Sequence, residues 1–258
     1  YRKEKNIPFK TSIKLYCIPN NKPIDNIDVI KKIGFVEDII ESVKADFGLV
    51  KSFIIKNLSP HSLKVYSFSR KDIDFEYENV ENIIIDFDNI NNEKLFLNID
   101  DLYIALGTTI KKAGTSKEFE KIDFHYCYSL AKHAYDCGVK RISIVSSAGS
   151  NPKSKFLYPR VKGRMEGELK KIKFQCVSIA KPGIILGKRK ETRFGELIGK
   201  FIFKLLDPFL LGKLSNYKSI HAQTIAKAMI HSLSGEQNGI FELHFKELVQ
   251  HSIKFNNL

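Results

Sequence analysis

The stretch from Arg141 to Lys162 constrains the fold of this chain more than any other. It opens with the apolar run ISIV, which is typical of a buried strand. A polar loop with Ser147 follows, and then Tyr158 and Lys162, which are four residues apart. Residues at this spacing lie one turn apart on the same face of a helix. The stretch therefore predicts a strand, a loop and a helix that bring a serine near a tyrosine–lysine pair.

This combination of side chains is suited to proton transfer. A lysine cation favours tyrosinate and so lowers the pKa of a tyrosine, whereas a serine hydroxyl can hold a carbonyl oxygen. Pro159 fits the first turn of a helix, where its missing N–H is not needed. Tyrosine and lysine four apart also form ordinary surface pairs, so the prediction depends on the Ser-Ser strand end before them. Ser147 is the first candidate for the serine and Ser146 the second.

Short apolar segments alternate with segments of helical periodicity along most of the chain. With 258 residues and 43% hydrophobic content, the chain can bury one large core. Strands are expected at 64–69, 82–87, 101–106, 142–145 and 174–180, and helices at 52–58, 89–97, 117–137 and 224–233, with a last strand and helix within 239–249.

Three segments resemble a known family: LYIALGTTIKKAG, VKRISIVSSAGSNPKSKFLYPRVKGRMEGEL and KPGIILGKRKETRFGE. They are similar to the atypical branch of the short-chain dehydrogenase/reductase superfamily, and most of all to its Tat-interacting-protein-like oxidoreductases. The resemblance is specific from Leu102 to Glu196 and fainter outside it. It implies a nicotinamide cofactor and catalytic roles for Ser147, Tyr158 and Lys162.

The resemblance also implies the architecture: α/β, a Rossmann-type doubly wound parallel sheet with helices on both faces, in a single domain with a small C-terminal substrate region. That domain is expected to span residues 36–258, with 184–258 contributing the substrate region. Residues 1–35 are set apart as an N-terminal extension of unknown role, although a loose alternation at 10–18 suggests a strand within it.

The glycine-rich loop that binds a dinucleotide is degenerate. Its best candidate lies within residues 39–58, where the three glycine positions are Ala45, Gly48 and Lys51. Glycines there permit a tight turn and a close approach of the backbone to a diphosphate. Gly48 and Leu49 are the residues expected to contact the cofactor. The loss of the other two glycines is the main argument against cofactor binding.

Two strand ends carry further candidates for the cofactor site. Arg70 and Lys71 follow the strand at 64–69, and basic residues there suit the 2′-phosphate of NADP, whereas NAD usually meets an acidic residue. A glycine at a strand end lets the backbone approach a ligand, and threonine hydroxyls can meet a ribose. Gly107, Thr108 and Thr109 occupy such a position.

The resemblance supplies the remaining cofactor contacts. It implies that Asp86 and Phe87 lie near the adenine, and that Pro182 and Gly183 pass the nicotinamide side. Residues 184–186 would then form part of the wall of a substrate pocket.

Net charge and the spacing of cysteines and histidines limit the classes of partner that the chain is expected to bind. The net charge of +13 favours anionic partners, but the lysines are scattered and no basic motif is interleaved with aromatic residues, which argues against a nucleic-acid site. The four cysteines form no C-x-x-C pair and the seven histidines show no ligand spacing, so no metal is expected. Unpaired thiols indicate an intracellular compartment.

Location and accessory surfaces are inferred from the same composition. We expect no transmembrane segment and a cytoplasmic protein, with an organelle left open because the chain begins at Tyr1 without methionine. The segment from Phe194 to Leu214 is amphipathic and basic. It is interpreted as a substrate lid, with a membrane-surface or partner-binding element as the alternative.

Two hypotheses of function follow. The first is an NADP-dependent oxidoreductase that transfers a hydride to or from a small carbonyl or alcohol substrate. The second is a catalytically inactive Rossmann-fold scaffold or binding subunit with a protein partner, favoured by the degenerate loop. The oligomeric state is left open by the sequence.

Overall fold

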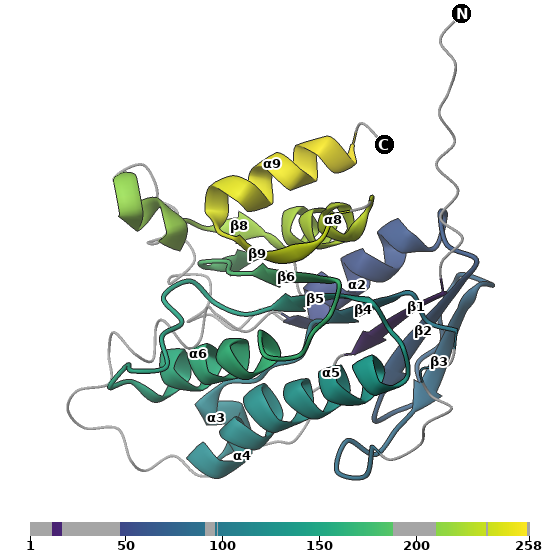
Figure 1. The fold of residues 1–258 in the computed structure, drawn as a ribbon, viewed down its shortest axis with the longest axis horizontal. Helices are drawn as coiled ribbons and strands as arrows, with labels where there is room; N and C mark the ends of the chain where they lie inside the picture. Colours follow the sequence, from purple (N-terminus) through teal and green to yellow (C-terminus); the bar gives the residue numbers. More distant parts are fainter. Residues whose placement is uncertain are drawn as a thin grey trace, which may run out of the picture.

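A computed structural model describes the backbone of residues 12–16, together with residues 47–90, 96, 98–187, 210–235 and 237–256. Within these residues the main sheet has seven strands in the order β3-β2-β1-β4-β5-β6-β9, and every neighbouring pair is parallel (Figure 1). The expected fold class, a Rossmann-type α/β sheet, is confirmed. The strands are β1 (Ser12–Tyr16), β2 (Lys64–Ser69), β3 (Val80–Ile84), β4 (Asp101–Ile104), β5 (Arg141–Val145), β6 (Cys176–Ala180) and β9 (Gly239–Leu243).

Strand β1 corrects the expected N-terminal boundary. It pairs with β2 on one side and with β4 on the other, so it lies in the middle of the sheet. It falls within residues 1–35, which the sequence analysis sets apart as an extension, and it matches the alternation at 10–18. At least these five residues belong to the domain.

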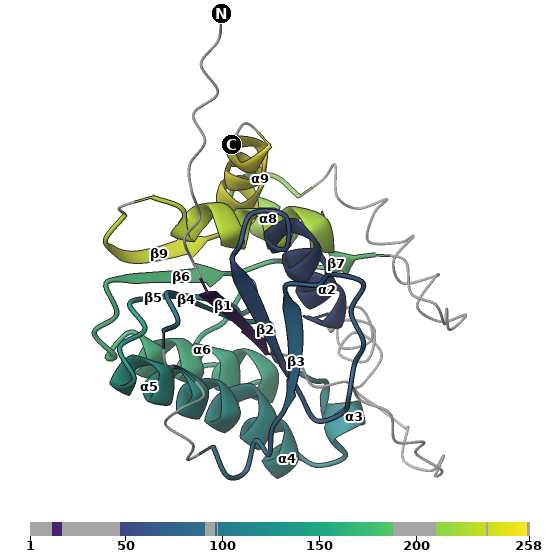
Figure 2. The ribbon, with the colours of Figure 1, turned by 90° about the vertical axis from the view of Figure 1, so that its right-hand side faces the viewer.

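Helices cover both faces of the sheet. One layer contains α2 (Phe47–Leu58), α8 (Ala222–Leu233) and α9 (Phe245–Phe255), and the other contains α4 (Ser116–Glu120), α5 (Cys127–Asp136) and α6 (Leu157–Leu169), as Figures 1 and 2 show. Strand β4 explains why both layers are needed. Leu102 and Ile104 pack with the α5–α6 layer, whereas Tyr103 packs with the α2–α8 layer. A strand buried on both faces is typically a near-continuous apolar run, as residues 102–104 are here.

Most expected elements agree with the structure. Strand β2 has the expected bounds, β3 begins two residues before the expected strand at 82–87, and helix α8 extends the expected one at 224–233 by two residues. Most of the helix expected at 89–97 and of the segment from Phe194 to Leu214 lies outside the described residues. In the described part of the chain, no helix combines the length and the apolar character that crossing a membrane requires.

The C-terminal third contributes to the main sheet as well as to smaller structures. It supplies β9, and a separate two-stranded parallel sheet of β7 (Ile185–Leu186) and β8 (Ile220–His221). A short 3₁₀ helix, η4 (Gly212–Tyr217), precedes β8. The described residues from 184 onwards therefore contribute a strand to the main sheet as well as forming the smaller one.

A π-helical turn interrupts the long helix expected at 117–137. Helix α4 passes directly into η2 (Lys121–Tyr126), a π-helical segment, and then into α5. A short α3 (Ile110–Ala113) precedes them. Such π-helical turns are frequent at functional sites because they redirect a side chain without ending the helix. Here the turn contains Asp123, whose side chain is fully buried.

Gly163 lets a loop cross helix α6 at very short range. A Cβ at this position would lie 2.5 Å from the carbonyl carbon of Asn151 and 2.7 Å from its nitrogen. The same loop is held to the helix by a 2.9 Å hydrogen bond from Asn151 N to Pro159 O. The loop joins the end of β5 to the start of α6, so this contact sets how the serine strand end meets the helix with Tyr158.

Two alanine substitutions in α6 are expected to change stability in opposite directions. Gly163→Ala overpacks the loop contact and should lower the free energy of unfolding by about 1–3 kcal/mol. Gly167→Ala is the matched control, because a Cβ there meets nothing within 4 Å. It should raise the free energy of unfolding by about 0.5–1 kcal/mol through helix propensity alone. Urea denaturation measures both, and equal effects of the two substitutions would contradict the close loop crossing.

Candidate functional site

The candidate site lies where the strands β4, β5 and β6 end. All three are parallel, so their carboxyl ends share one edge of the sheet, the usual ligand edge of such folds. The loop after β5 is tied to the loop after β6 by two backbone hydrogen bonds. Ser146 N donates to Ala180 O at 2.7 Å and Ala148 N donates to Pro182 O at 2.8 Å. The expected serine and the expected Pro182–Gly183 loop are thereby adjacent.

Helix α6 carries the tyrosine–lysine pair as expected. It begins at Leu157, so Tyr158 and Pro159 are in its first turn, and Lys162 follows one turn later. Tyr158 is 8% exposed and its ring packs against Phe119, with 5.7 Å between ring centroids. Tyr158 also interacts electrostatically with Lys162 and contributes to raising the lysine pKa. The two side chains therefore act on each other.

Lys162 forms a buried ion pair that the sequence analysis did not find. Its Nζ lies 2.8 Å from Oδ1 of Asp123, and both side chains are fully buried. Oδ2 of Asp123 accepts a 2.8 Å hydrogen bond from Thr108 N, at the end of β4. The pair joins α6, the π-helical turn and the β4 loop. Asp123 gave no signal in the sequence, because only the π-helical turn directs it towards a lysine 39 residues away.

The protonation of this pair follows from its surroundings. Burial alone would lower the pKa of Lys162, but the neighbouring Asp123 carboxylate raises it above its usual value. Burial raises the pKa of Asp123, and Lys162 and the Thr108 amide oppose that effect. Lys162 therefore remains an ammonium at neutral pH. An ammonium beside Tyr158 is the charge that stabilises tyrosinate.

Phe47, the first residue of α2, covers the lysine. The Lys162 Nζ is 4.8 Å from the centroid of the Phe47 ring, within the range of a cation–π contact. The ring also packs directly on Gly107, where a Cβ would lie 2.5 Å from its Cε2 atom. Gly107 thus permits the close approach of a side chain of the protein itself.

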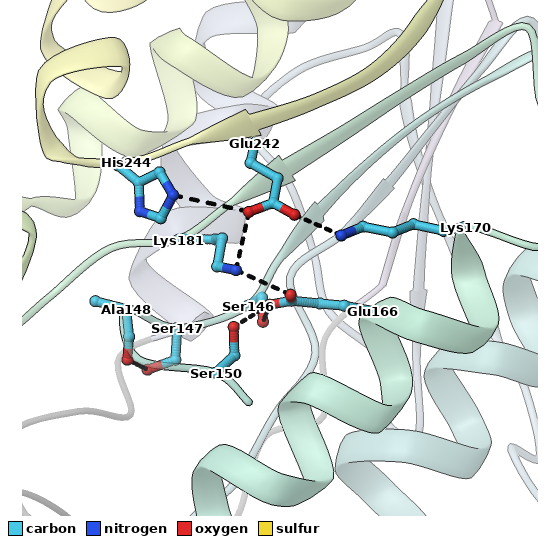
Figure 3. Close-up of polar contacts among 9 residues, drawn as sticks. All are labelled: Ser146, Ser147, Ala148, Ser150, Glu166, Lys170, Lys181, Glu242 and His244. Carbon is cyan, nitrogen blue, oxygen red and sulfur yellow. Dashed lines mark hydrogen bonds and ion pairs between the residues drawn. The ribbon is translucent and has the colours of Figure 1, made fainter. Parts of the chain in front are cut away.

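The two serines differ in their hydrogen bonds. The hydroxyl of Ser146 donates to Glu166 Oε1, whereas the hydroxyl of Ser147 donates to the carbonyl of Ala148 at 3.1 Å (Figure 3). Both serines are buried. Because a charged acceptor holds Ser146 more strongly than a neutral carbonyl holds Ser147, this arrangement favours Ser147 as the serine that is free to turn towards a ligand.

The expected phosphate-loop positions that the structure describes lie at the start of helix α2. Gly48 and Leu49 lie inside helix α2, and Ala45 lies outside the described residues. Lys51 is also helical and only 5% exposed, and its Nζ donates to Phe68 O at 3.2 Å. Its amine thus reaches the backbone of β2. In the described part of the chain, the strand that comes before α2 is β1.

The other expected cofactor contacts lie at strand ends. Arg70 and Lys71 are exposed directly after β2. After β3, Asp86 is exposed and its carboxylate accepts hydrogen bonds from Asp88 N at 3.0 Å and from Asn89 Nδ2 at 2.7 Å. Phe87 is 3% exposed and packs in the core. Asp86 therefore shapes a turn at the carboxyl edge of the sheet.

The threonines and Gly183 also have local structural partners. Thr109 caps α3, because its hydroxyl accepts a 3.1 Å hydrogen bond from Lys112 N. Gly183 is packed against the chain at the end of η4, where a Cβ would lie 2.6 Å from the Tyr217 carbonyl oxygen. The Tyr217 side chain lies over Gly149 in the serine loop. No pattern in the sequence marks Tyr217 as part of this site.

The cysteines and potential metal ligands form no centre in the described residues. Cys127, Cys137 and Cys176 are free thiols, and Cys17 lies outside the described part of the chain. Burial raises the pKa of Cys127 to about 12, so it is a thiol at neutral pH. Within residues 47–187 and 210–256 as far as they are described, no three metal-ligating side chains gather.

Comparison with other proteins identifies relatives. No family model matches the chain. Protein HTATIP2 of Rattus norvegicus is 32% identical over 208 residues, covering 79% of this chain and 82% of that protein. Protein FMP52, mitochondrial, of Candida albicans is 45% identical over 93 residues, 36% of this chain and 41% of that protein. The fmp52 protein of Emericella nidulans, also named mitochondrial, is 34% identical over 57% of this chain and 66% of that protein.

Solved structures agree with the fold. A UDP-N-acetylglucosamine 4-epimerase from Methanobrevibacter ruminantium M1 matches with a TM-score of 0.60 and 14% identity, covering 91% of this chain and 76% of that one. MoeE5 in complex with UDP-glucuronic acid and NAD matches with a TM-score of 0.61 and 12% identity, covering 96% and 83%. At these identities the likeness concerns the fold.

Proposed function

Because the chain belongs to the HTATIP2-like family of atypical short-chain dehydrogenases/reductases, we propose that it is an NADP-dependent oxidoreductase acting on a small carbonyl or alcohol. The observation that carries the proposal is the buried Lys162 ammonium, held charged by Asp123 and interacting with Tyr158. A scaffold has no need for a charged lysine beside a buried tyrosine.

The chemistry assigns one role to each side chain. Tyr158 donates a proton to the carbonyl oxygen in reduction and accepts it in oxidation. Lys162 stabilises the tyrosinate, and the Ser147 hydroxyl holds the substrate oxygen. A bound nicotinamide dinucleotide would supply the hydride.

The described residues fit the ribose end of such a cofactor. A lysine ammonium has three donors, and the ion pair with Asp123 uses one of them. The remaining donors suit ribose hydroxyls, and Gly107 leaves room for close approach once the Phe47 ring moves aside. We assign Lys162, Tyr158 and the backbone at Gly107 to this end of the cofactor, with Pro182 and Gly183 beside the nicotinamide.

The residues expected at the adenine end of the cofactor support NADP over NAD. Arg70 and Lys71 are exposed at the end of β2, where a ribose 2′-phosphate would lie in a fold of this kind. Gly48, Leu49, Asp86, Phe87, Thr108 and Thr109 complete the proposed set.

A second function is favoured by the start of α2. Phe47 covers Lys162, and Lys51 is buried against the backbone of β2 where a dinucleotide fold usually has a small residue. If Phe47 stays in place, the chain is a Rossmann-fold binding subunit for a protein partner and has no redox activity.

Titration with NADPH and with NADH distinguishes the two functions. We expect NADPH to bind in the micromolar range, measured by nicotinamide fluorescence and calorimetry. Arg70→Ala should weaken NADPH by about 10-fold or more, the usual loss for a charge-assisted contact to phosphate, and leave NADH unchanged. Lys64→Ala, at the other end of β2, is the control. Absence of binding of both nucleotides at millimolar concentration would overturn the oxidoreductase.

The compartment is inferred from the relatives. The FMP52 relatives are named mitochondrial, which favours an organelle over the cytoplasm within the intracellular location that the sequence analysis expects. Fluorescent tagging of the full natural protein tests this directly.

A further inference from the structure

A second buried charge cluster lies next to the serine loop (Figure 3). Glu166 of α6 is 4% exposed, and its Oε2 accepts a 3.0 Å hydrogen bond from Lys181 Nζ, at the end of β6. Lys181 is 7% exposed and donates a second hydrogen bond, of 3.1 Å, to Glu242 Oε2 of β9. The cluster therefore links α6, β6 and β9.

The outer part of the cluster keeps these charges paired. Glu242 also forms an ion pair with Lys170, the residue that follows α6, and one of its carboxylate oxygens lies 3.7 Å from Nε2 of His244, the N-cap residue of α9. Partial burial alone would raise the pKa of Glu242, but hydrogen bonds from Lys170 and Lys181 lower it to about 2. Burial would lower the pKa of Lys181, and Glu166 raises it. At neutral pH, Glu242 and Lys181 are both charged.

Glu166 holds both sides of the proposed substrate serine. Its Oε1 accepts hydrogen bonds from the hydroxyls of Ser146 and Ser150, which flank Ser147 in the loop after β5. Its Oε2 holds Lys181, which directly precedes the Pro182–Gly183 loop. One carboxylate thus fastens two loops of the site to α6, one turn beyond Lys162.

We propose that Glu166 is a positioning residue, which sets Ser147 and the Pro182–Gly183 loop against Tyr158 and Lys162 for hydride transfer. The proposal rests on the proposed oxidoreductase function. The helix that carries the proton donor also carries the carboxylate that holds the substrate serine loop. A displacement of about 1 Å in such an arrangement lowers the rate about 100-fold, so a rigid link of this kind matters for turnover.

The pattern of hydrogen bonds makes glutamate necessary. A carboxylate accepts at both oxygens, so it can hold two hydroxyls on one and an ammonium on the other. A glutamine has only one acceptor oxygen, and its NH₂ group would face either the serines or the Lys181 ammonium. Lys181 would retain Glu242 in a Glu166→Gln variant, so no charge is left unpaired and the fold should persist.

Glu166→Gln is therefore the test, with Glu168→Gln as its matched control. Glu168 lies on the same helix and pairs with Lys171 at the surface, at 2.7 Å. We expect Glu166→Gln to lower kcat about 10- to 100-fold with the Kd for NADPH changed less than about 2-fold, since the effect is on the alignment of the reacting groups. Glu168→Gln should match the wild type. An unchanged kcat in Glu166→Gln would overturn the proposal.

A second readout does not need turnover. The amides of Ser146 and Ala148 are bonded to Ala180 O and Pro182 O, and their hydrogen exchange should accelerate in Glu166→Gln but not in Glu168→Gln. If the wild type neither binds nucleotide nor reduces carbonyls, the proposed function is rejected. Unchanged hydrogen exchange in Glu166→Gln would, separately, reject the positioning role of Glu166. If Glu166→Gln does not fold, the Ser146→Ala/Ser150→Ala variant removes the same two hydrogen bonds, and unchanged exchange and kcat there would equally reject it.

Discussion

Replacing Asp123 with asparagine is expected to lower the free energy of unfolding by about 3–5 kcal/mol, the usual effect of removing one partner of a buried ion pair. The substitution preserves shape and leaves the Lys162 ammonium without a counter-charge in a fully buried position. Urea denaturation with circular dichroism measures the change. Asp123 raises the pKa of Lys162, whereas burial lowers it. Without the Asp123 carboxylate, burial lowers the pKa of Lys162 in the folded variant below that in the unfolded chain. The variant should therefore be less stable at neutral pH than at high pH, where the lysine is deprotonated.

Two controls separate this effect from other causes. Glu120→Gln breaks an ion pair between α4 and α6 that lies at the surface, with Arg164, and should lower the free energy of unfolding by less than about 1 kcal/mol. Asp123→Asn combined with Lys162→Met removes the unpaired charge and should regain most of the lost stability. If Asp123→Asn is no more harmful than Glu120→Gln, the buried ion pair does not form as described.

Tyr158→Phe is expected to lower turnover about 10²- to 10⁴-fold, the range that a general acid contributes. The phenylalanine ring keeps the packing against Phe119 and loses only the hydroxyl that transfers the proton. The Kd for NADPH should rise far less than turnover falls, because Tyr158 is only one of the proposed ribose contacts and those of Lys162 remain. Consumption of NADPH at 340 nm with a panel of aldehydes and ketones measures turnover.

Tyr135→Phe is the matched control for this prediction. Tyr135 lies near the end of α5 and packs against Phe174, before β6, at the opposite edge of the sheet from the site. Its loss of a hydroxyl should leave turnover unchanged. Equal turnover in Tyr158→Phe and the wild type would reject Tyr158 as the proton donor, even if NADPH binds.

The elements that have a local sequence pattern were predicted correctly. Strand β2 and helix α6 have short, self-contained signals: an alternating or apolar run, turn residues, and Pro159 in a first turn. Strand β1 has only five residues and is separated from α2 by 30 residues, so no strand–loop–helix pattern marks it. Its place in the sheet depends on the pairing with β2 and β4.

The sequence by itself placed Tyr158 and Lys162 on one helix face, because spacing along the chain is a local property. The resemblance of three segments to a known family implied the Rossmann-type sheet. Only the tertiary structure decided which charges meet. Asp123 reaches Lys162 through a π-helical turn, and Glu166 reaches Ser146 and Lys181 across two strand ends. Such pairs join residues that are distant along the chain. Packing of the core brings them within hydrogen-bond distance, and their spacing in the sequence does not predict this.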